Sequence, residues 1–580
     1  MKKYYIGLSS TFHDSALAIM DGEGKILFAE ATERRLQYKR ALNCPPDNFD
    51  IGPILKKYCN QDSEFVVATS WSEEYLQLLN RLEKMNFFSE ESLKNPLLQV
   101  PSKFLFPKAA FYTFLKLQHQ FLKTVGTGLF LNLQKQFPLS TVTFKKYEHH
   151  LTHAAYASYT SPYTDGACLI MDGFGEAKSI SLYHYNDDQL KQLWFHKGPE
   201  SLGWFYELVT TLCGFDWFTG EEWKVMGLAP YGKINQAFYV LLKELCQYKN
   251  GKLKYPDEKK IQELILKLEA YKRPKDSSPW TAADLAFTGQ FVFSEIVLEV
   301  LKDVESLNVS KNLIIGGGCG LNSSFNGTVI EKTGFDNLFV PSAPADDGNA
   351  IGAAMLAFKE YNPAKIIGRK PFFSPYLGSS ISDETLKRLV QMGKIKNVRH
   401  LPLTIHTETA KKLAEGKLVA WVQGRAEFGP RSLGNRSIIA DPRPENMKDI
   451  INSKVKFREE FRPFAPSILH EFGEEYFEYY QETPYMERTL VFREGVKVKI
   501  HAVVHANHTG RLQTVKKEWN PSYYKLIKAF YDITGVPLVL NTSLNIMGKP
   551  IIHSLEDAIG MFYTTGLDVL IVNDYIIEKD

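Results

Sequence analysis

Apolar and polar positions alternate over the first thirty residues in the way that is typical of a β-hairpin. The stretches YYIGLSS and SALAIMDGEGKILFAEATE surround the turn-forming steps Asp21–Gly22 and Glu23–Gly24. This pattern predicts a strand, a turn and a strand over residues 4–30. A second run of the same kind, ACLIMDGFGEAKSISLYHY, follows a predicted strand near 141–145 and a predicted helix in YEHHLTHAAYASYT.

The middle and the end of the chain alternate between strand and helix patterns. KNLIIGGGCGLNSSFNGTVI predicts a strand, a glycine turn and a helix, and DNLFVPSAPADDGNAIGAAMLAFKEY repeats this order with a helix that opens near Gly348. Helical signals stop at Tyr361–Asn362–Pro363. Beyond that point KLVAWVQG, VPLVLNTSLN and LDVLIVND are β-branched strands between helices. The fold class is therefore α/β.

The length of 580 residues exceeds what one hydrophobic core supports, so two or more domains are expected. The segment 104–137 is rich in aromatic residues, leucine and lysine, and we interpret it as an amphipathic insertion rather than as a membrane-surface helix pair. The expected parts are a first domain at 1–362 with helical insertions at about 47–140 and 200–300, a linker at 363–378 that is rich in proline and basic residues, and a second domain at 379–580.

Composition narrows the class of protein. The formal charge of +3 gives no sign of a nucleic-acid surface. The six cysteines are scattered without a CxxC pair, which argues against a disulfide framework and a zinc ribbon. No apolar run reaches membrane-spanning length, and the first residues lack the apolar core of a signal peptide. We expect a cytoplasmic enzyme.

Two histidines four residues apart are the strongest chemical signal in the chain. On a helix His149 and His153 lie on one face, one turn apart, where two imidazoles can hold one metal ion. Asp172 ends a buried strand, and Asp346 is the better ligand candidate in the helix opening DDGNAIGAA. Two histidines with two carboxylates suit iron(II), manganese or zinc. Capped or core histidines are the alternative.

The paired hairpins have the order expected of an actin-like, sugar-kinase-like ATPase fold, whose two related halves each open with a hairpin that touches phosphate. The glycine run before LN would let a nucleotide approach the backbone, because glycine has no side chain to collide with it. The expected nucleotide contacts are Gly317, Gly318 and Asn322. A plain tight turn is the competing interpretation of the run. ATP with Mg²⁺ is the expected nucleotide.

An arginine-rich run between Gly424 and Ser467 is the densest signal in the second domain. Glycines and prolines interrupt it, so it is not a solvated helix face, and forked guanidinium groups among tight turns suit phosphate binding. The later NTSLN motif follows a strand and offers amide and hydroxyl groups, although a plain turn would also explain it. The run contains Arg425, Arg431, Arg436, Arg443, Lys448, Lys454, Lys456, Arg458 and Arg462.

Taken together, these segments resemble the O-carbamoyltransferase family of the nodulation-factor, cephamycin and tobramycin type. The resemblance covers nearly the whole chain and implies a Kae-type ATPase fold for the first domain and a YrdC-type α/β fold for the second. The motifs that carry it are HDSALAIMDG, ERRLQYKR, EHHLTHAAYA, MDGFGE, KVMGLAPYG, GGGCGLN, DDGNAIGAA, GRAEFGPRSLGNRSIIADPR, FRPFAPS and NTSLN.

The resemblance implies that the second domain makes carbamoyl adenylate from ATP and carbamoyl phosphate, and that the first domain passes the carbamoyl group to a hydroxyl of a natural product. It puts iron(II) first among the metals. His13 is the candidate base and Lys39 a candidate contact to the intermediate, although a packing role for His13 and a surface position for Lys39 are as plausible. The adenylation candidates are Arg425, Arg431, Arg436, Lys456, Arg458, Asn541 and Ser543.

Three other functions are alternatives. A tRNA-modifying threonylcarbamoyl-type enzyme would be expected to carry a basic stripe, and a hydrogenase-maturation carbamoyltransferase would be expected to carry CxxC zinc modules. A non-catalytic actin-like ATP clamp would not need the arginine-rich second domain. The sequence leaves the acceptor and the oligomeric state open, a homodimer included.

Overall fold

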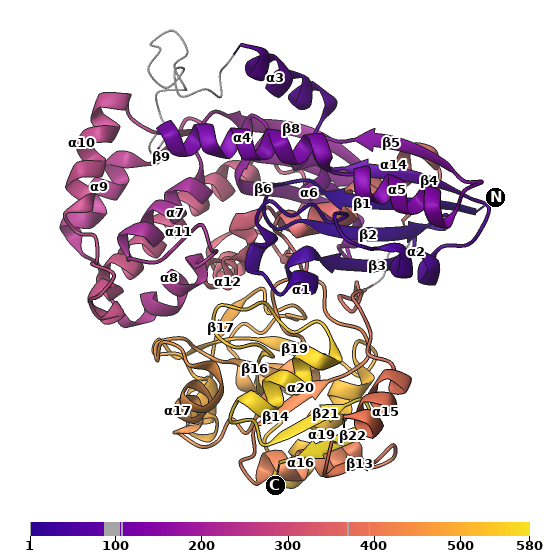
Figure 1. Cartoon of the computed structure of the whole chain (residues 1–580). Coiled ribbons are helices and arrows are strands. Elements are labelled where there is room, and N and C mark those ends of the chain that lie inside the picture. The colour runs from indigo at the N-terminus through magenta and orange to yellow at the C-terminus, as the bar shows by residue number, and fades with distance from the viewer. Residues whose placement is uncertain (1, 86–104, 106–107, 368–370, 394, 580) are drawn as a thin grey trace. The chain divides into compact units, whose positions relative to one another are not determined.

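The structure is a computed structural model that describes residues 2–85, 105, 108–367, 371–393 and 395–579 (Figure 1). Parts of the expected 47–140 insertion and of the expected 363–378 linker therefore lie outside the described residues. The chain forms two compact units. The first comprises residues 1–32, 40–321 and 332–373, and the second comprises residues 33–39, 322–331 and 374–580.

The first unit opens with a five-stranded mixed sheet in the order β3-β2-β1-β4-β5. β1 pairs antiparallel with β2, which pairs antiparallel with β3, whereas β1, β4 and β5 run parallel. The Oδ1 of Asp21 accepts hydrogen bonds from the backbone N–H groups of Glu23 and Lys25, which closes the predicted turn. The strands are β1 (Lys2–Ser9), β2 (Ala16–Asp21), β3 (Ile26–Ala31), β4 (Ser63–Thr69) and β5 (Thr141–Lys146).

A second sheet repeats this connectivity in the order β12-β11-β6-β7-β8. β6, β7 and β8 form an antiparallel meander, and β6, β11 and β12 run parallel. Two sheets with the same strand order and directions define the duplicated actin-like, sugar-kinase-like fold, which confirms that prediction. The strands are β6 (Asp165–Gly175), β7 (Lys178–Asn186), β8 (Gln189–Lys197), β11 (Asn312–Gly316) and β12 (Asn337–Phe339).

Two helices that are rich in small residues, α6 (His149–Thr160) and α14 (Asn349–Tyr361), join the two sheets of this unit (Figure 1). α14 contacts β1 of the first sheet and α6, and α6 contacts β6 and β11 of the second sheet. Glycine makes the approach of the two helices possible, since a Cβ on Gly352 would lie 2.0 Å from the carbonyl oxygen of Thr152. This pair of helices forms the centre of the unit.

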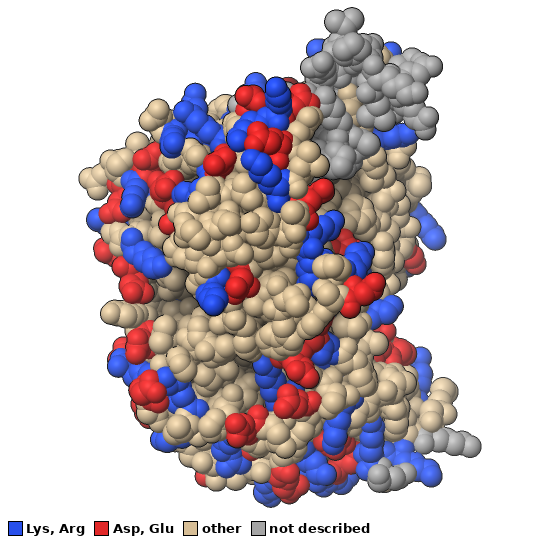
Figure 2. All heavy atoms as spheres, turned by 90° about the vertical axis from the view of Figure 1, so that its left-hand side faces the viewer, with Lys and Arg blue, Asp and Glu red and all other residues tan. Residues whose placement is uncertain are grey.

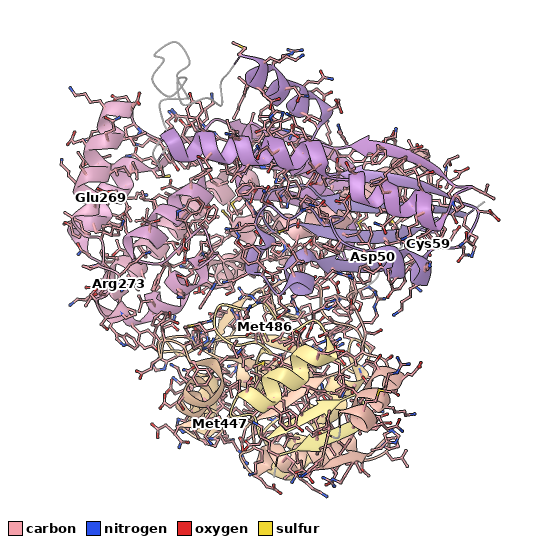
Figure 3. The ribbon with its side chains drawn as sticks, viewed as in Figure 1. Asp50, Cys59, Glu269, Arg273, Met447 and Met486 are labelled. Carbon is pink, nitrogen blue, oxygen red and sulfur yellow. The ribbon has the colours of Figure 1, made fainter. Side chains whose placement is uncertain are left out.

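Further helices cover the sheets, and residues 200–300 are mostly helical apart from a short hairpin of β9 (Gln247–Lys249) and β10 (Lys252–Lys254). Arg273 stabilises the loop after α7 by donating hydrogen bonds to the carbonyls of Cys213 and Gly214 (Figure 3). The other helices in this part of the chain are α1 (Thr32–Leu36), α2 (Gly52–Tyr58), α3 (Glu73–Lys84), α4 (Lys108–Thr124), α5 (Thr127–Gln136), α7 (Leu202–Leu212), α8 (Glu222–Leu228), α9 (Gln236–Leu245), α10 (Glu258–Glu269), α11 (Ala283–Ser306), α12 (Ser323–Asn326) and α13 (Val329–Lys332).

Within the expected helical insertion at about 47–140, the segment β4 is a core strand of the first sheet. Its sequence SEFVVAT is a short apolar run, and periodicity alone does not separate such a run from a buried helix segment. The aromatic segment behaves as an insertion that packs on this unit. Tyr112, Leu115 and Leu122 of α4 share a buried cluster with Trp71 and with residues of α3.

The second unit is built on an eight-stranded mixed sheet in the order β13-β22-β21-β14-β15-β20-β16-β19, which confirms the α/β prediction for the second half of the chain. The three runs that predicted strands correspond to β14, β20 and β21. The strands are β13 (Val398–His400), β14 (Val419–Val422), β15 (Arg436–Ala440), β16 (Ala465–Leu469), β19 (Gln513–Val515), β20 (Leu538–Ser543), β21 (Val569–Val572) and β22 (Tyr575–Glu578), with a separate pair of β17 (Thr489–Val491) and β18 (Thr509–Arg511).

Local sequence explains the helices of this unit. In α19 the Asn520 side chain caps the first turn, Pro521 occupies the first helical position and Gly535 ends the helix with a positive φ of 71°. Met447 begins α17 and is buried in the core (Figure 3). The helices are α15 (Asp383–Met392), α16 (Ile405–Ala414), α17 (Met447–Ile451), α18 (Gly473–Tyr476), α19 (Pro521–Thr534) and α20 (Leu555–Thr564).

Two short segments from early and middle parts of the chain belong to the second unit. Arg34 Nη2 donates to the carbonyl of Gly429 at 2.7 Å, and Asn326 Nδ2 donates to the carbonyl of Glu487 at 2.9 Å. Both side chains are buried, so these contacts are part of the core of the unit. Among the helices that the structure describes, none has the length and apolarity to cross a bilayer.

The approach of α6 and α14 gives a test of the fold. Substitution of Gly352 by alanine would place a methyl group against the Thr152 carbonyl, so we expect Gly352→Ala to destabilise the protein by about 1–3 kcal/mol. Gly560→Ala in α20 is the control, because nothing lies within 4 Å of its added Cβ. Thermal unfolding should show a lowered midpoint for the first variant only. Equal midpoints for the two variants would contradict the close packing.

Candidate active site

The start of α6 sets the positions of the two histidines. The carboxylate of Glu148 caps the helix by accepting hydrogen bonds from the N–H groups of His150 at 3.1 Å and Leu151 at 2.9 Å. His149 and His153 then lie one turn apart on one face, with 3.2 Å between their Nε2 atoms. Both imidazoles are buried.

Two carboxylates from other elements meet these imidazoles. Asp172 lies in β6, and Asp346 begins the short turn that precedes α14. The Nε2 of His149 lies 3.4 Å from Asp172 Oδ2 and 3.4 Å from Asp346 Oδ1, and the Nε2 of His153 lies 3.2 Å from Asp346 Oδ1. One ligand atom from each of the four residues lies within 4.8 Å of the others. The structure therefore brings together all four residues that the sequence singled out as metal ligands.

The spacing of these atoms fits a common ion. Ligand atoms about 2.0–2.2 Å from one cation and at right-angled or tetrahedral positions lie about 2.8–3.6 Å from one another. Four separations between ligand atoms in the cluster, 3.2 to 3.4 Å, fall in this range, and the separation of 3.9 Å between His153 Nε2 and Asp172 Oδ2 is slightly longer. Two nitrogen and two carboxylate donors match the set expected for iron(II), manganese or zinc.

The electrostatics of the cluster favour a cation. Burial acts to lower the pKa of His149, but the negative charges of Asp346 and Asp172 hold it well above its usual value. Burial acts in the opposite direction on the carboxyl groups, and the histidines nevertheless keep the pKa of Asp172 at about 2 and that of Asp346 well below its usual value. The carboxylates thus stay ionised and attract positive charge.

The glycine run supports this cluster. The backbone N–H of Gly318 donates to Asp172 Oδ1 at 2.8 Å, which orients the carboxylate. Gly317 has a φ of 82°, and a Cβ there would lie 2.3 Å from the Met171 carbonyl, so the turn requires glycine. Asn322, the third expected nucleotide contact, accepts a hydrogen bond from the N–H of Phe325 as the cap of the four-residue helix α12.

The turn after β1 brings His13 beside the cluster. His13 Nδ1 lies 3.7 Å from Asp346 Oδ2 and 3.0 Å from Asp14 Oδ2. Arg40 donates to the same Asp14 oxygen through Nε at 3.1 Å and Nη2 at 2.9 Å, and Nη2 lies 3.1 Å from His13 Nδ1. Arg40, the chain neighbour of the candidate residue Lys39, therefore lies beside His13 and Asp14.

Lys39 begins the short turn Lys39–Ala41 and is half-buried. The sequence motif ERRLQYKR ends in Lys39 and Arg40, but it does not indicate which of the two side chains contacts the turn after β1. Arg40 has a φ of 61°, an uncommon conformation that turns its side chain to a different direction from that of its neighbours. The positive φ is a tertiary property that no local pattern predicts.

A group of basic side chains gathers in the second unit. Burial together with the charges of Arg458 and Arg462 lowers the pKa of Lys456 well below its usual value, and burial lowers the pKa of Arg431 to about 10. Burial together with Arg462 and Arg511 does the same to Arg458. The charges of Arg462 and Arg511 act on Arg458, and those of Arg431 and Arg462 act on Arg511. We call Arg431, Lys456, Arg458, Arg462 and Arg511 the basic cluster.

The position of Lys456 is fixed by an irregular turn. The residues Asn452–Lys456 form a π-helical turn, a feature often found at functional sites, and Phe457 follows with a φ of 48°. Lys456 Nζ donates to the Asn545 side chain at 2.7 Å and to the Asn545 carbonyl at 3.0 Å, and it also bonds the Ser543 carbonyl. Ser543 of the NTSLN motif thus lies beside the basic cluster.

Three other expected adenylation residues hold the framework of this unit. Arg436 is fully buried and donates to the carbonyls of Gln423, Asn435, Ser379 and Gly424. Arg425 donates to the carbonyls of Gly378 and Leu377. The Asn541 side chain donates to Ser432, Ser467 and Gln513. The hydrogen bonds of these three side chains therefore go to acceptors within the protein.

Arg511 is the member of the basic cluster that sequence reasoning missed. It lies in β18, about fifty residues after the arginine-rich run, and its short context TGRLQ carries no local signal. Burial together with Arg431 and Arg462 lowers its pKa well below the usual value. The pairing of β18 with β17 places it, which a one-dimensional pattern does not reveal.

The first unit is a duplicated actin-like fold with a buried His/Asp cluster, and the second is an α/β unit with a basic cluster. The model of the carbamoyltransferase N-terminus matches residues 4–355, and the model of the carbamoyltransferase C-terminus matches residues 410–579. The chain belongs to the carbamoyltransferase family. It is a transferase that acts on carbamoyl groups, and it uses a carbamoyl donor and an acceptor.

Similar proteins include two nodulation proteins. The chain is 36% identical to NolNO of Sinorhizobium fredii over 74% of its own length and 63% of that protein, and 34% identical to NolO of Bradyrhizobium diazoefficiens over 74% and 78%. An uncharacterized protein of Synechocystis is 31% identical over 99% of this chain and 97% of its own. HypF of T. kodakarensis aligns with 63% of this chain and 49% of its own at 10% identity and a TM-score of 0.28, so the fold assignment rests on the strand topology instead.

The Arg40–Asp14 contact predicts a pH-dependent stability. Burial acts to raise the pKa of Asp14, and Arg40 with His13 holds it below its ordinary 3.8. Arg40→Leu should therefore lower the free energy of unfolding by about 1–3 kcal/mol at neutral pH. Because the pKa of Asp14 is lower in the folded state than in the unfolded state, its ionised carboxylate stabilises the fold above pH 3.8. This stabilisation is lost as the pH falls through the lowered pKa. The difference between variant and wild type should shrink in acid.

Urea unfolding at pH 7 and at the lowest pH that leaves both proteins folded measures this difference. Arg388→Leu is the control, because Arg388 is exposed and pairs with Glu384 on the same helix turn, where such pairs contribute little. A loss for Arg40→Leu that is the same at both pH values would show that Asp14 is not the partner that matters.

The basic cluster predicts opposite effects of two arginine substitutions. Arg511→Met removes one of several neighbouring cations, so we expect the thermal midpoint of the ligand-free protein to stay equal or to rise. Arg436→Met removes the donor to four carbonyls and should destabilise the protein by about 1–3 kcal/mol. Differential scanning calorimetry of both variants makes the comparison. A drop for Arg511→Met as large as that for Arg436→Met would assign Arg511 to the framework.

Proposed function

We propose that this carbamoyltransferase depends on ATP. In this proposal residues 379–580 form carbamoyl adenylate from ATP and carbamoyl phosphate, and residues 1–362 pass the carbamoyl group to a hydroxyl of a natural product. Residues 363–378 link the two parts. ATP is an intracellular substrate, so we place the reaction in the cytoplasm.

The basic cluster is the observation that carries the proposal. Burial penalises the charges of Arg431, Lys456, Arg458 and Arg511, and repulsion from neighbouring arginines adds to this cost at the last three, so the ligand-free protein is raised in energy. The pair of Arg462 Nη1 with Glu459 Oε2 at 3.3 Å offsets part of this charge. A ligand with several negative charges would satisfy the remainder, and ATP together with carbamoyl phosphate has this property.

Adenylation solves a chemical problem of the carbamoyl group. Nitrogen donates electron density into the carbonyl and makes it a weak electrophile, and a mixed anhydride with AMP supplies a good leaving group. In the first step, water hydrolyses carbamoyl phosphate to carbamate and inorganic phosphate. A carbamate oxygen then attacks the α-phosphorus of ATP, and pyrophosphate leaves. Arg431, Lys456 and Arg458 are the residues that we assign to binding these phosphates and the charge that develops on them.

His13 is our candidate for taking the proton of the acceptor hydroxyl. The Asp14 carboxylate, 3.0 Å from His13 Nδ1, favours the tautomer with a proton on Nδ1 and leaves Nε2 to act as the base. Arg40 holds Asp14 in place through two hydrogen bonds. The hydroxyl oxygen attacks the carbamoyl carbon, and AMP leaves with the anhydride oxygen.

The four residues His149, His153, Asp172 and Asp346 would hold a divalent ion, iron(II) first and manganese or zinc next. Such an ion would supply positive charge for the phosphate of the intermediate. The chain itself orients these ligands through the Gly318 N–H on Asp172 and the Ser70 carbonyl, 3.3 Å from His149 Nδ1.

The natural-product acceptor is the least constrained part of the proposal. Two similar proteins are named nodulation proteins, and we propose a small hydroxylated molecule as the acceptor. A tRNA acceptor is the second candidate, and a basic surface would favour it. Figure 2 shows lysine and arginine interspersed with aspartate and glutamate on the face that it presents, and the formal net charge is +3.

The test is an assay of purified protein with ATP, carbamoyl phosphate and a panel of hydroxylated natural products. We expect release of pyrophosphate that depends on carbamoyl phosphate, and a product that is heavier by one carbamoyl group in mass spectrometry. Lys456→Met should abolish pyrophosphate release, because it removes a cation from the phosphate site. Carbamoylation of an acceptor without ATP would refute the adenylate step, and ATP turnover that ignores carbamoyl phosphate would favour an ATP clamp.

A further inference from the structure

One buried amide contacts the His/Asp cluster and is not explained by the four expected ligands. Asn349 is the first residue of α14 and is fully buried. Its Nδ2 lies 3.1 Å from His153 Nε2, the same atom that faces Asp346 Oδ1 at 3.2 Å. Its Oδ1 is buried and has no hydrogen-bond partner among the described residues.

The usual reason for asparagine at the start of a helix does not apply here. An asparagine that caps a helix accepts hydrogen bonds from backbone N–H groups of the first turn, as Asn520 does in α19. The Oδ1 of Asn349 accepts no such bond, and a buried carbonyl oxygen without a partner costs about 1–3 kcal/mol. Some other group is therefore needed to satisfy this oxygen.

The present orientation of the amide also competes with the expected role of His153. The Nδ2 group donates toward the lone pair of His153 Nε2, which is the lone pair that a metal ion would use. The two ends of a carboxamide have nearly the same shape, so a half-turn about the last side-chain bond exchanges Nδ2 and Oδ1 without a change in packing. With a cation in the cluster, the turned amide would direct its oxygen to the ion and leave His153 Nε2 free to bind it.

We propose that Asn349 is a fifth protein ligand of the metal centre and that it binds the ion through Oδ1. This inference rests on the proposed metal centre of His149, His153, Asp172 and Asp346. It adds a neutral oxygen donor to two nitrogen and two carboxylate donors. Zinc in protein sites prefers four ligands, whereas iron(II) and manganese(II) accept more oxygen ligands. Asn349 thus biases the site toward iron(II) or manganese(II) and against zinc.

The experiment compares wild-type protein with Asn349→Leu and Asn349→Asp after removal of metal and reloading. Leucine has a similar size but no donor, so we expect a loss of manganese(II) affinity of roughly 10–100-fold, the scale seen when groups around a metal are removed. Aspartate keeps an oxygen at the same place and should retain the ion. Cobalt(II) absorption should change from the weak bands of a five- or six-coordinate ion in wild type to the intense bands of a four-coordinate ion in Asn349→Leu.

Asn326→Leu controls for the loss of a buried asparagine, because Asn326 is buried in the second unit and donates to the Glu487 carbonyl. It should leave the metal affinity unchanged. If Asn349→Leu does not fold, Asn349→Asp and a crystal structure of the metal-loaded wild type decide the matter. An oxygen of Asn349 bound at about 2.0–2.2 Å supports the proposal, and an amide that stays hydrogen-bonded to His153 overturns it.

Two failures can be told apart. If wild type retains no metal and His149→Ala behaves like wild type, the proposed metal centre itself is wrong. If wild type holds an ion that His149→Ala loses, while Asn349→Leu has wild-type affinity or an unchanged cobalt(II) spectrum, only the role of Asn349 is wrong.

Discussion

The close approach of α6 to α14 is the constraint on which the rest of the first unit depends. α6 carries His149 and His153, and the turn before α14 carries Asp346. Gly352 allows the two backbones to come so near that a side chain would not fit between them. Because the imidazoles and the carboxylates are buried together, each compensates for the desolvation of the other. The cluster therefore stabilises the fold only when both helices are in place.

The two units use buried charge in opposite ways. In the first unit, carboxylates and imidazoles lie within hydrogen-bond distance and partly neutralise one another. In the second unit, burial and the charges of neighbouring arginines lower the pKa of Lys456, Arg458 and Arg511, so the ligand-free site carries electrostatic repulsion. Arg436 supports this part of the fold by donating to four carbonyls. In the proposed function, an anionic ligand would offset this repulsion.

Sequence reasoning succeeded where chemistry follows from local spacing. The i, i+4 pair His149 and His153 must share a face of any helix, and the duplicated hairpins revealed the fold class. It was less successful where tertiary structure decides. Arg40 reaches Asp14 from a backbone conformation with positive φ that no local pattern indicates, and Arg511 lies in a strand pair far from the arginine-rich run. Charge density along the chain also does not reveal that Arg436 donates to carbonyls from four different residues.

The duplication explains why the groups of the first unit meet at one centre. Each half opens with a strand and a hairpin, and corresponding ends of the two sheets face the shared helices α6 and α14. The first half contributes His13 from the turn after β1, and the second contributes Asp172 from β6, so both hairpins approach Asp346 from related positions. Equivalent places in the two halves carry different side chains. A duplicated scaffold therefore supplies an asymmetric site, which combines His13 from the first half with Asp172 and Asp346 from the second half.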